Sequence, residues 1–433
     1  MNLYLIKEFL KKFLPKSFLG FYHFILAFFG ALFYRFPSKK IKVIGVTGTN
    51  GKTTVTEMIA EILEEAGYKI ALMNSVRFKI GDQVKENLLK MTMPGRFTIQ
   101  RFLRKAVDNN CQYFVLEVTS EGIKQHRHRF INFEAAIFTN LSPEHIESHG
   151  GFEKYQKAKG ELFKITKNIH VINNDDPYAQ YFLQFEAKTK YLYQITNKNQ
   201  ELKITVVGSK SEILKEIKIP GIKLNLYGDF NIYNALAGIC LALSQGIDLE
   251  ISKRALEKFK GVPGRMELVI NEPFKVFIDY AFTPNALEKV YQTLKPKERN
   301  KNMICVLGAC GGGRDKWKRP VLGEIAAKYC DKIIITNEDP YDEDPYQILS
   351  MIKSGIFKSQ FPDSDFYEIL DRREAIKKSL ELARPGDTVI ITGKGSEPWM
   401  CLAKGKKIPW DEKEIVKEEA KKILSKISGP GGN

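Results

Sequence analysis

The residues best suited to chemistry lie in one glycine-rich segment, Gly45–Thr54, which has the sequence GVTGTNGKTT. An apolar, β-branched run at Ile41–Val46 precedes the glycines, and a helical pattern follows them as far as Gly67. In a strand, loop and helix of this kind, backbone N–H groups and the helix N-terminus bind phosphate oxygens. We therefore predict a nucleoside-triphosphate site, although Val46 stands where the usual pattern begins with glycine.

Individual side chains of this loop suit the same purpose. Lys52 would reach the β- and γ-phosphates, and the Thr53 hydroxyl would bind Mg²⁺. Glu117, at the end of another predicted strand, would be a second ligand, because Mg²⁺ prefers hard oxygen donors. The alternatives are a glycine-rich turn without a ligand and a solvated acid at a strand end. The loop residues expected to contact ATP are Gly48, Thr49, Asn50, Gly51, Lys52, Thr53 and Thr54.

The elements that must position these residues alternate between strands and helices, which predicts an α/β fold with a parallel sheet. Residues 180–228 differ, because short alternating strands with scattered lysines indicate a small antiparallel flap, followed by a helix at Asn231–Gln245. Besides Ile41–Val46, the first half has predicted strands at Tyr113–Val118, Ala135–Thr139 and His170–Asn173.

A second α/β unit is expected after Gly261–Gly264, and a polar, glycine-rich tail at Ser428–Asn433. We predict three parts: an amphipathic or membrane-associated helical segment at residues 1–40, a central ATP-binding domain at 41–262 and a C-terminal domain at 263–433. The predicted strands of the last part are Val276–Asp279, Met303–Leu307, Lys332–Thr336 and Thr388–Ile391.

The first 42 residues are strongly basic around an apolar run. Eight Lys or Arg residues and one acid, Glu8, surround the uncharged, aromatic segment Phe18–Tyr34, in a chain of net charge +16. This segment is at the lower limit of length for a membrane-spanning helix. An interfacial helix on anionic lipid is favoured over a short span, a buried helix or a signal peptide. We expect weak peripheral contact with the inner face of the membrane.

Other features exclude several classes of protein. No helix-turn-helix, zinc-finger or RNP pattern occurs, so nucleic acid is not an expected partner despite the positive charge. The six cysteines form no C-x-x-C pair, which argues against a zinc ribbon or a redox dithiol. These thiols fit a reducing compartment, and we predict a cytoplasmic protein.

The string TGTNGKTT resembles the nucleotide loop of the Mur ligase family and of folylpolyglutamate synthetases, and the resemblance extends over about residues 41–400. Gln125-His126-Arg127 looks like a segment of the tripeptide-synthetase (MurE) branch, and Gly264-Arg265-Met266-Glu267 resembles a motif of the family. The other matching segments are Glu117–Ser120, Phe138–His145, Tyr155–Lys159, Val171–Asp176, Gly228–Asn234, Asp279–Pro284, Gly313–Pro320 and Gly393–Gly395.

This resemblance implies an ATP-dependent ligase that adds an amino acid, in this branch a diamino acid, to a muramyl-peptide precursor of peptidoglycan. A precursor carboxylate would attack the γ-phosphoryl group, and an amine would then displace phosphate from the acyl phosphate. Phosphoryl transfer depends mainly on positioning and charge neutralisation. The resemblance also implies a central P-loop ATPase domain followed by a Rossmann-like C-terminal domain, with ATP and Mg²⁺ as cofactors.

The resemblance assigns roles to particular residues. Those implied to be catalytic are Lys52, Glu117, His145, Lys159 and Arg265. The implied metal ligands are Thr53, Glu117, His145 and, as a carbamate, Lys159. The implied nucleotide contacts outside the loop are Asn231, Asn234, Arg265 and Asp279, with Lys316 and Arg319 on a nearby basic loop. The implied precursor contacts are Thr92, Pro94, Thr119, Ser120, Gln125 and Arg127. The implied amino-acid contacts are Asp339, Tyr341, Gly395 and Glu397.

Several of these residues have structural alternatives. Asn231, Asn234 and His145 could instead cap helices. Lys159 could be an exposed helix lysine, and the basic loop with Lys316 and Arg319 a solvated turn.

Three departures from the family pattern bear on the substrate. The resemblance begins near residue 41, and a 40-residue apolar, basic segment cannot be the family's uridine-binding domain, so a lipid-linked acceptor competes with a UDP-linked one. Tyr341 replaces an arginine of the amino-acid selector. Glu121 and Phe282 replace histidines, for which we expect altered substrate contacts rather than loss of activity.

The selector region is also acidic. Asp339, Asp342, Glu343 and Asp344 follow one another closely and favour a cationic substrate end such as lysine or ornithine, unless the loop merely faces water. Three other functions compete with the main prediction: a MurT-like amidating ligase on a lipid-linked precursor, a folylpolyglutamate synthetase and a non-catalytic nucleotide sensor. The absence of a four-cysteine zinc ribbon, with the GRME and RDKxKRP matches, argues against the first. The QHR and DYAxTP matches argue against the second, and the presence of Lys52, Glu117 and His145 argues against the third.

Overall fold

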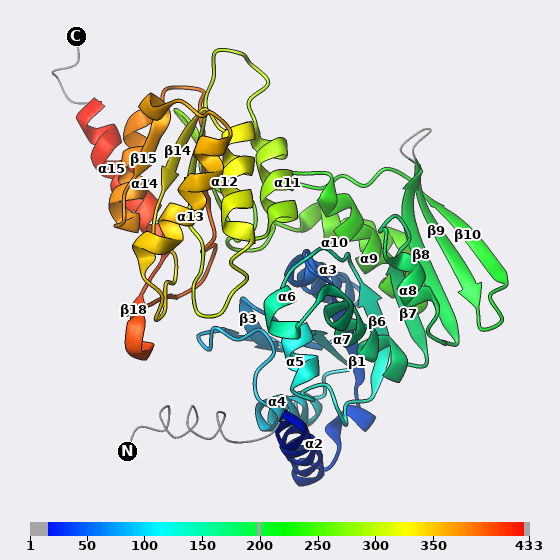
Figure 1. Cartoon of the computed structure of the whole chain (residues 1–433). Helices are drawn as coiled ribbons and strands as arrows, with labels where there is room; N and C mark the ends of the chain where they lie inside the picture. The colour runs from blue at the N-terminus through cyan, green and yellow to red at the C-terminus, as the bar shows by residue number, and fades with distance from the viewer. Residues whose placement is uncertain (1–15, 197–200, 428–433) are drawn as a thin grey trace. The chain divides into compact units, whose positions relative to one another are not determined.

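The computed structural model describes residues 16–196 and 201–427, which form two compact units (Figure 1). Among the described residues, unit 1 comprises 16–141, 153–196, 201–223 and 232–259, and unit 2 comprises 142–152, 224–231 and 260–427. The predicted tail at Ser428–Asn433 and the basic residues before Lys16 lie outside the described residues.

Unit 1 is built on a ten-stranded sheet in the order β10-β9-β8-β7-β6-β1-β5-β2-β3-β4. Its central strands are parallel, as predicted. They are buried and apolar because helices cover both faces of such a sheet. The central strands are β1 (Lys42–Thr47), β2 (Ile70–Met73), β5 (Tyr113–Glu117), β6 (Phe133–Phe138) and β7 (Ile169–Asn173).

Antiparallel strands lie at both edges of this sheet. The predicted flap consists of β8 (Thr189–Thr196), β9 (Glu201–Gly208) and β10 (Ile213–Ile219). It extends the main sheet, because β8 pairs in parallel with β7 and antiparallel with β9. The hairpin of β3 (Arg77–Ile80) and β4 (Gln83–Glu86) at the other edge was not predicted, because each strand has only four residues, half-buried in β3 and exposed in β4.

The helices with most of their residues in unit 1 flank this sheet (Figure 1). Helix α2 packs against α4, and α3 packs against α10. Among the described residues, no helix is both long and apolar enough to cross a membrane. These helices are α2 (Lys16–Phe33), α3 (Lys52–Glu65), α4 (Arg96–Asp108), α5 (Ser120–Lys124), α7 (Phe152–Ile165), α8 (Ala179–Leu183), α9 (Phe230–Ser244) and α10 (Leu249–Lys258).

Unit 2 contains a six-stranded sheet in the order β11-β12-β16-β13-β14-β15, with an apolar core on each face. All pairs except β11 with β12 are parallel, so the α/β prediction is confirmed here too. The strands are β11 (Glu267–Ile270), β12 (Lys275–Asp279), β13 (Met303–Leu307), β14 (Lys332–Ile335), β15 (Phe366–Glu368) and β16 (Thr388–Thr392), with a separate hairpin of β17 (Trp399–Cys401) and β18 (Lys407–Pro409). The helices are α6 (Ile146–His149), α11 (Pro284–Leu294), α12 (Lys318–Tyr329), α13 (Pro345–Lys358), α14 (Arg372–Leu382) and α15 (Glu412–Ile427).

A buried ion pair joins α14 to α15. The Arg372 guanidinium binds the Glu412 carboxylate and donates to the carbonyl of Thr392 at 2.8 Å, and the side chains of Arg372 and Glu412 are 1% and 0% exposed. The Trp410 indole N–H also donates to Glu412, at 2.6 Å. Removing the carboxylate would leave a buried guanidinium without its counter-charge.

We predict that Glu412→Ala lowers the free energy of unfolding by about 3–5 kcal/mol, measured by urea titration. Glu418→Ala is the matched control, since Glu418 lies on the same helix and pairs with Arg373 at the surface. The control should lose under about 1 kcal/mol. Equal losses of unfolding free energy in the two variants would show that the buried Arg372–Glu412 pair stabilises the fold no more than a surface pair.

Candidate active site

The nucleotide loop follows β1 and leads into α3, as predicted. Gly48 and Gly51 have φ angles of 151° and 82°, which side chains rarely adopt. A Cβ on Gly48 would lie 1.9 Å from the Thr139 hydroxyl, and one on Gly51 would lie 2.5 Å from the Asn234 amide oxygen. Glycine is therefore required at both positions, and Asn234 lies against the loop.

Two residues that follow β6 hold this loop in place. The Thr139 hydroxyl donates to the carbonyl of Asn50 at 2.7 Å. The Asn140 side chain accepts from the Asn50 backbone N–H and donates to its carbonyl, both at 3.0 Å. No side chain caps α3, as in helices whose N-terminus binds phosphate. The Lys52 ammonium lies over the loop and donates to the carbonyls of Gly48 and Thr49, at 3.1 and 2.8 Å.

Thr53 and Glu117, two predicted Mg²⁺ ligands of unit 1, are in direct contact. Thr53 and Glu117 are nearly buried, and the Thr53 hydroxyl donates to the Glu117 carboxylate at 3.0 Å. Among the described residues no group of three or more His, Cys, Asp or Glu side chains forms a metal site. Two hard oxygen donors fit Mg²⁺, which commonly takes its remaining ligands from phosphates and water.

Sequence reasoning missed Ser75, which binds the same carboxylate. Its backbone N–H and its hydroxyl both donate to Glu117, at 3.0 and 2.8 Å. The Ser75 hydroxyl also lies 3.3 Å from that of Thr92, a predicted precursor contact. The available signal was its position, because Ser75 follows the buried strand β2 and polar residues after parallel strands gather at one edge of the sheet.

The other predicted precursor contacts cluster beside Thr92. Arg127 donates to the carbonyl of Met93 and, at 2.7 Å, to the Gln125 side chain. Thr119 caps α5 by accepting from the backbone N–H of Gly122 at 3.1 Å. Two further predicted contacts, Pro94 and Ser120, are buried near these residues in the chain.

Lys159 points into the nucleotide loop. It is 2% exposed, and its ammonium donates to the carbonyl of Gly48 at 2.6 Å and lies 4.6 Å from the centre of the Tyr155 ring. The alternative of an exposed helix lysine is therefore wrong. Tyr155, one turn earlier on α7, lies with its hydroxyl 3.0 Å from that of Thr49. This tyrosine had no predicted role.

His145 lies in unit 2, whereas Thr53, Glu117 and Lys159 lie in unit 1. It has φ 57° and precedes α6 without a side-chain capping bond, so the helix-cap alternative is wrong. The carboxylate of Asp315 instead accepts from the first backbone N–H groups of α6, those of Ile146 and Glu147, at 3.0 Å each.

The basic segment after Asp315 corrects one prediction. Lys316 lies on a loop, but Arg319 lies in α12, is 1% exposed and pairs with Glu343 at 2.9 Å. Arg319 is therefore neither on a loop nor solvated. Lys318, which had no predicted role, forms a buried pair with Glu144 at 2.8 Å.

Asp279 ends β12 and holds the following turn. Its two oxygens accept from the backbone N–H groups of Met266 and Ala281, at 2.6 Å each. Burial raises the pKa of Asp279 to about 6, although the Arg265 charge and these N–H groups oppose the rise. The Arg265 guanidinium stacks 4.3 Å from the centre of the Tyr280 ring. Asn231, the predicted adenine contact of this unit, donates to the carbonyl of Tyr227 at 2.7 Å.

The predicted amino-acid contacts surround a buried lysine. Lys394 is fully buried and pairs with Asp339 at 2.9 Å and with Glu397 at 3.0 Å. Glu397 also accepts from the Tyr280 hydroxyl at 2.9 Å. Gly395 has φ 52° and approaches the carbonyl of Gly264 closely.

The acids of the selector region have partners within the protein. Asp339 pairs with Lys394, Glu343 pairs with Arg319, Asp342 accepts from the backbone of Lys404, and Asp344 caps α13. The alternative of an acidic loop that faces water is wrong for Asp339, which is 1% exposed, whereas Asp342 and Asp344 are exposed. The number of acidic residues in this region therefore does not give the negative charge that is available to a cationic substrate.

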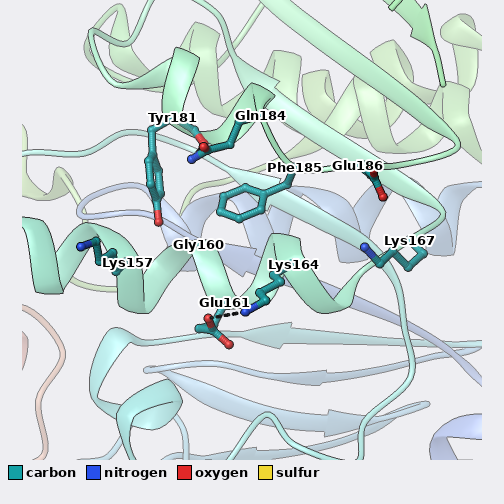
Figure 2. A pocket seen from close by; sticks show the side chains of 9 residues that line it. All are labelled: Lys157, Gly160, Glu161, Lys164, Lys167, Tyr181, Gln184, Phe185 and Glu186. Atoms are coloured by element: carbon teal, nitrogen blue, oxygen red, sulfur yellow. Dashed lines mark hydrogen bonds and ion pairs between the residues drawn. The ribbon is translucent and has the colours of Figure 1, made fainter. Parts of the chain in front are cut away.

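A hollow of about 480 Å³ lies beside α7, and Lys159 is not among the residues that line it (Figure 2). Tyr181 and Phe185 approach Gly160 there, and exposed lysines and glutamates surround them. None of the predicted site residues lines this hollow.

Comparison with known proteins decides the family. Residues 46–242 match the Mur ligase middle domain, and residues 264–395 match the glutamate ligase domain of Mur ligases. A UDP-N-acetylmuramoyl-L-alanyl-D-glutamate–2,6-diaminopimelate ligase of Syntrophomonas wolfei is 40% identical over 402 residues, which cover 91% of this chain and 81% of the relative. The chain belongs to the Mur ligase family. This confirms the resemblance seen in the sequence.

Other relatives of this Mur ligase agree. An enzyme of the same name from Aquifex aeolicus is 39% identical and covers 89% of the chain and 79% of its own length. A solved structure of a diaminopimelate ligase is 30% identical with a TM-score of 0.56, covering 88% of this chain and 78% of that one. The folylpolyglutamate synthase of Mycobacterium tuberculosis has a TM-score of 0.62 over 90% of this chain and 95% of its own, but at 16% identity it shows the fold alone.

The raised pKa of Asp279 in this Mur ligase gives a pH-dependent effect on stability. Because the folded pKa lies above the ordinary value of 3.8, the carboxyl stabilises the fold at low pH and loses that contribution as pH rises through about 6. We predict that Asp279→Ala is more destabilising at about pH 4.5 than at pH 7, by about 2 kcal/mol in urea titrations. A pH-independent loss would contradict the raised pKa.

Proposed function

We propose that this Mur ligase forms an amide between a muramyl-peptide carboxylate and a diamino acid, with ATP and Mg²⁺. One observation carries the proposal. The Glu117 carboxylate receives hydrogen bonds from Thr53, in the nucleotide loop, and from Ser75, whose hydroxyl reaches Thr92. The predicted phosphate site and the predicted precursor site are therefore connected through one buried carboxylate.

The residues of unit 1 suit the phosphoryl-transfer step. A precursor carboxylate oxygen attacks the γ-phosphorus, the bond to ADP breaks, and an acyl phosphate results. The N–H groups of the loop and Lys52 bind the phosphates, and Thr53 and Glu117 would hold Mg²⁺, which neutralises phosphate charge when bound. Lys159 lies at the carbonyl of Gly48, where a carbamate on its nitrogen would replace a buried positive charge with a negative one.

The residues of unit 2 suit recognition of the amino acid. The incoming amine attacks the acyl carbon, phosphate leaves, and the amine loses a proton. Glu397 is held by Lys394 and Tyr280 and would accept hydrogen bonds from the amine. The Tyr341 ring lies against Gly312, and the guanidinium of Arg314, two residues further along the chain, would bind a distal carboxylate where the selector arginine is replaced.

We propose diaminopimelate as the diamino acid, because the selector acids are already paired and the relatives named above are diaminopimelate ligases. Phosphate release from ATP with a muramyl-dipeptide acceptor should be stimulated by diaminopimelate more than by lysine, ornithine or ammonia. Preference for lysine or ornithine would instead support the prediction that the acidic residues of the selector region bind a cationic substrate end. Preference for ammonia would favour the amidating alternative.

We predict that Glu117→Gln lowers kcat/KM by about 100-fold or more, since it removes a charge from the phosphate site without changing its shape. Lys52→Ala should act similarly. Lys157→Ala is the control, because Lys157 is exposed on α7 and lines only the separate hollow. Phosphate release and melting temperature would be measured together. Full activity in Glu117→Gln would remove Glu117 from the proposed site.

We further propose that the chain is cytoplasmic and peripheral to the membrane, and that its acceptor is lipid-linked. This is supported by α2, which exposes aromatic side chains and lies against the segment that contains Gln125 and Arg127. Turnover of a lipid-linked muramyl dipeptide in vesicles should exceed that of the UDP-linked form. Faster turnover of the UDP-linked form would contradict a lipid-linked acceptor.

A further inference from the structure

Helix α2 has two different faces. Ala27 and Ala31 are 2% and 0% exposed. A Cβ on Gly30 would lie 3.6 Å from the Phe97 ring of α4. Small residues on this face allow close packing of α2 against α4.

The opposite face of α2 is a row of exposed, mostly aromatic side chains. No charged residue lies between Lys16 and Arg35. An exposed apolar surface that is contiguous in this way is uncommon in proteins that act alone in water. The exposed side chains are Phe21, Tyr22, Phe24, Phe28, Phe29, Leu32 and Phe33, with exposed fractions from 39% at Phe28 to 73% at Phe33.

Further exposed apolar and basic side chains lie on α4, which packs against α2, or adjoin these two helices in the chain. Phe97, which contacts α2, is 40% exposed, and Leu88, Leu89 and Met91 of the preceding segment are also exposed. Arg101 is exposed one turn after Phe97 on α4. Arg35, Lys39 and Lys40, just after α2, are exposed as well. The apolar row is thus accompanied by positive charge.

We propose that the exposed face of α2, together with Phe97 and its basic neighbours, docks on an anionic lipid surface. Aromatic side chains favour the boundary between lipid and water, and each Lys or Arg near an anionic surface adds about fivefold to partitioning. A charge-free aromatic row with cations beside it matches a helix that lies in the interface. A protein partner explains the apolar row but gives no reason for the accompanying charge.

Docking of α2 on the membrane would bring the proposed acceptor site close to the lipid surface. This step rests on the lipid-linked acceptor proposed above. The Phe24 ring lies 6.1 Å from the His126 ring and 5.2 Å from that of Phe130, and Phe28 lies 5.4 Å from Phe130. Helix α2 therefore supports the segment that carries Arg127. A membrane bound by α2 would lie close to the precursor contacts.

The test is cosedimentation of the full chain with vesicles of phosphatidylcholine, with and without phosphatidylglycerol. We expect binding that requires the anionic lipid, weakens with salt and falls about tenfold or more in the double variant Phe29→Ser/Phe33→Ser. The matched control is Ile213→Ser/Leu214→Ser, which removes two exposed apolar side chains from β10. The control should bind like the original chain.

Several outcomes would overturn the docking proposal: no binding to anionic vesicles, equal binding by both double variants, or a dimer without lipid that only Phe29→Ser/Phe33→Ser dissociates. Unchanged melting temperatures verify folding, since Phe29 and Phe33 are exposed. Turnover of a soluble UDP-linked acceptor distinguishes the docking proposal from the proposal of a lipid-linked acceptor. Vesicle binding with faster turnover of the UDP-linked acceptor leaves docking intact and rejects only the lipid-linked acceptor.

Discussion

Parallel pairing of β1 with β5 and β6 is the constraint on which the nucleotide site depends. Val46 pairs with Glu117, and Thr47 pairs with Phe138, so the three strands end at the same edge of the sheet. Parallel strands must end together in this way, because their connections return across the faces of the sheet. The loop after β1, the carboxylate of Glu117 and the residues after β6 therefore meet without any long side chain reaching across the unit.

The same edge of the sheet also brings the proposed precursor contact Thr92 close to the proposed phosphate site. Strand β2 pairs in parallel with β5, which brings Ser75 to Glu117. Ser75 then lies between the proposed metal ligands, Thr53 and Glu117, and Thr92. Small hydroxyls are suited to this position, because each can donate to a carboxylate and still accept another hydrogen bond.

Unit 2 depends more on paired charge. Lys394, Arg372 and Lys318 are buried, and each lies against a glutamate or aspartate. A buried charge without a partner would be strongly unfavourable, so these pairs fix the loops that carry Asp339, Glu397 and His145. The charged side chains near the proposed amino-acid contacts are thus mostly paired with one another within the protein.

The sequence by itself determined the family, the α/β class, the glycine-rich loop between β1 and α3 and most strands, because those properties depend on local patterns of glycine, apolar and polar residues. It also singled out Thr53 and Glu117. It did not determine that Lys159 is buried at Gly48, that Arg319 lies in a helix or that Asp339 is already paired. Only the tertiary structure decided these points, and it alone revealed Ser75. Hydrogen bonds and ion pairs join residues far apart in the chain, so local sequence patterns do not show which partners a polar side chain has found.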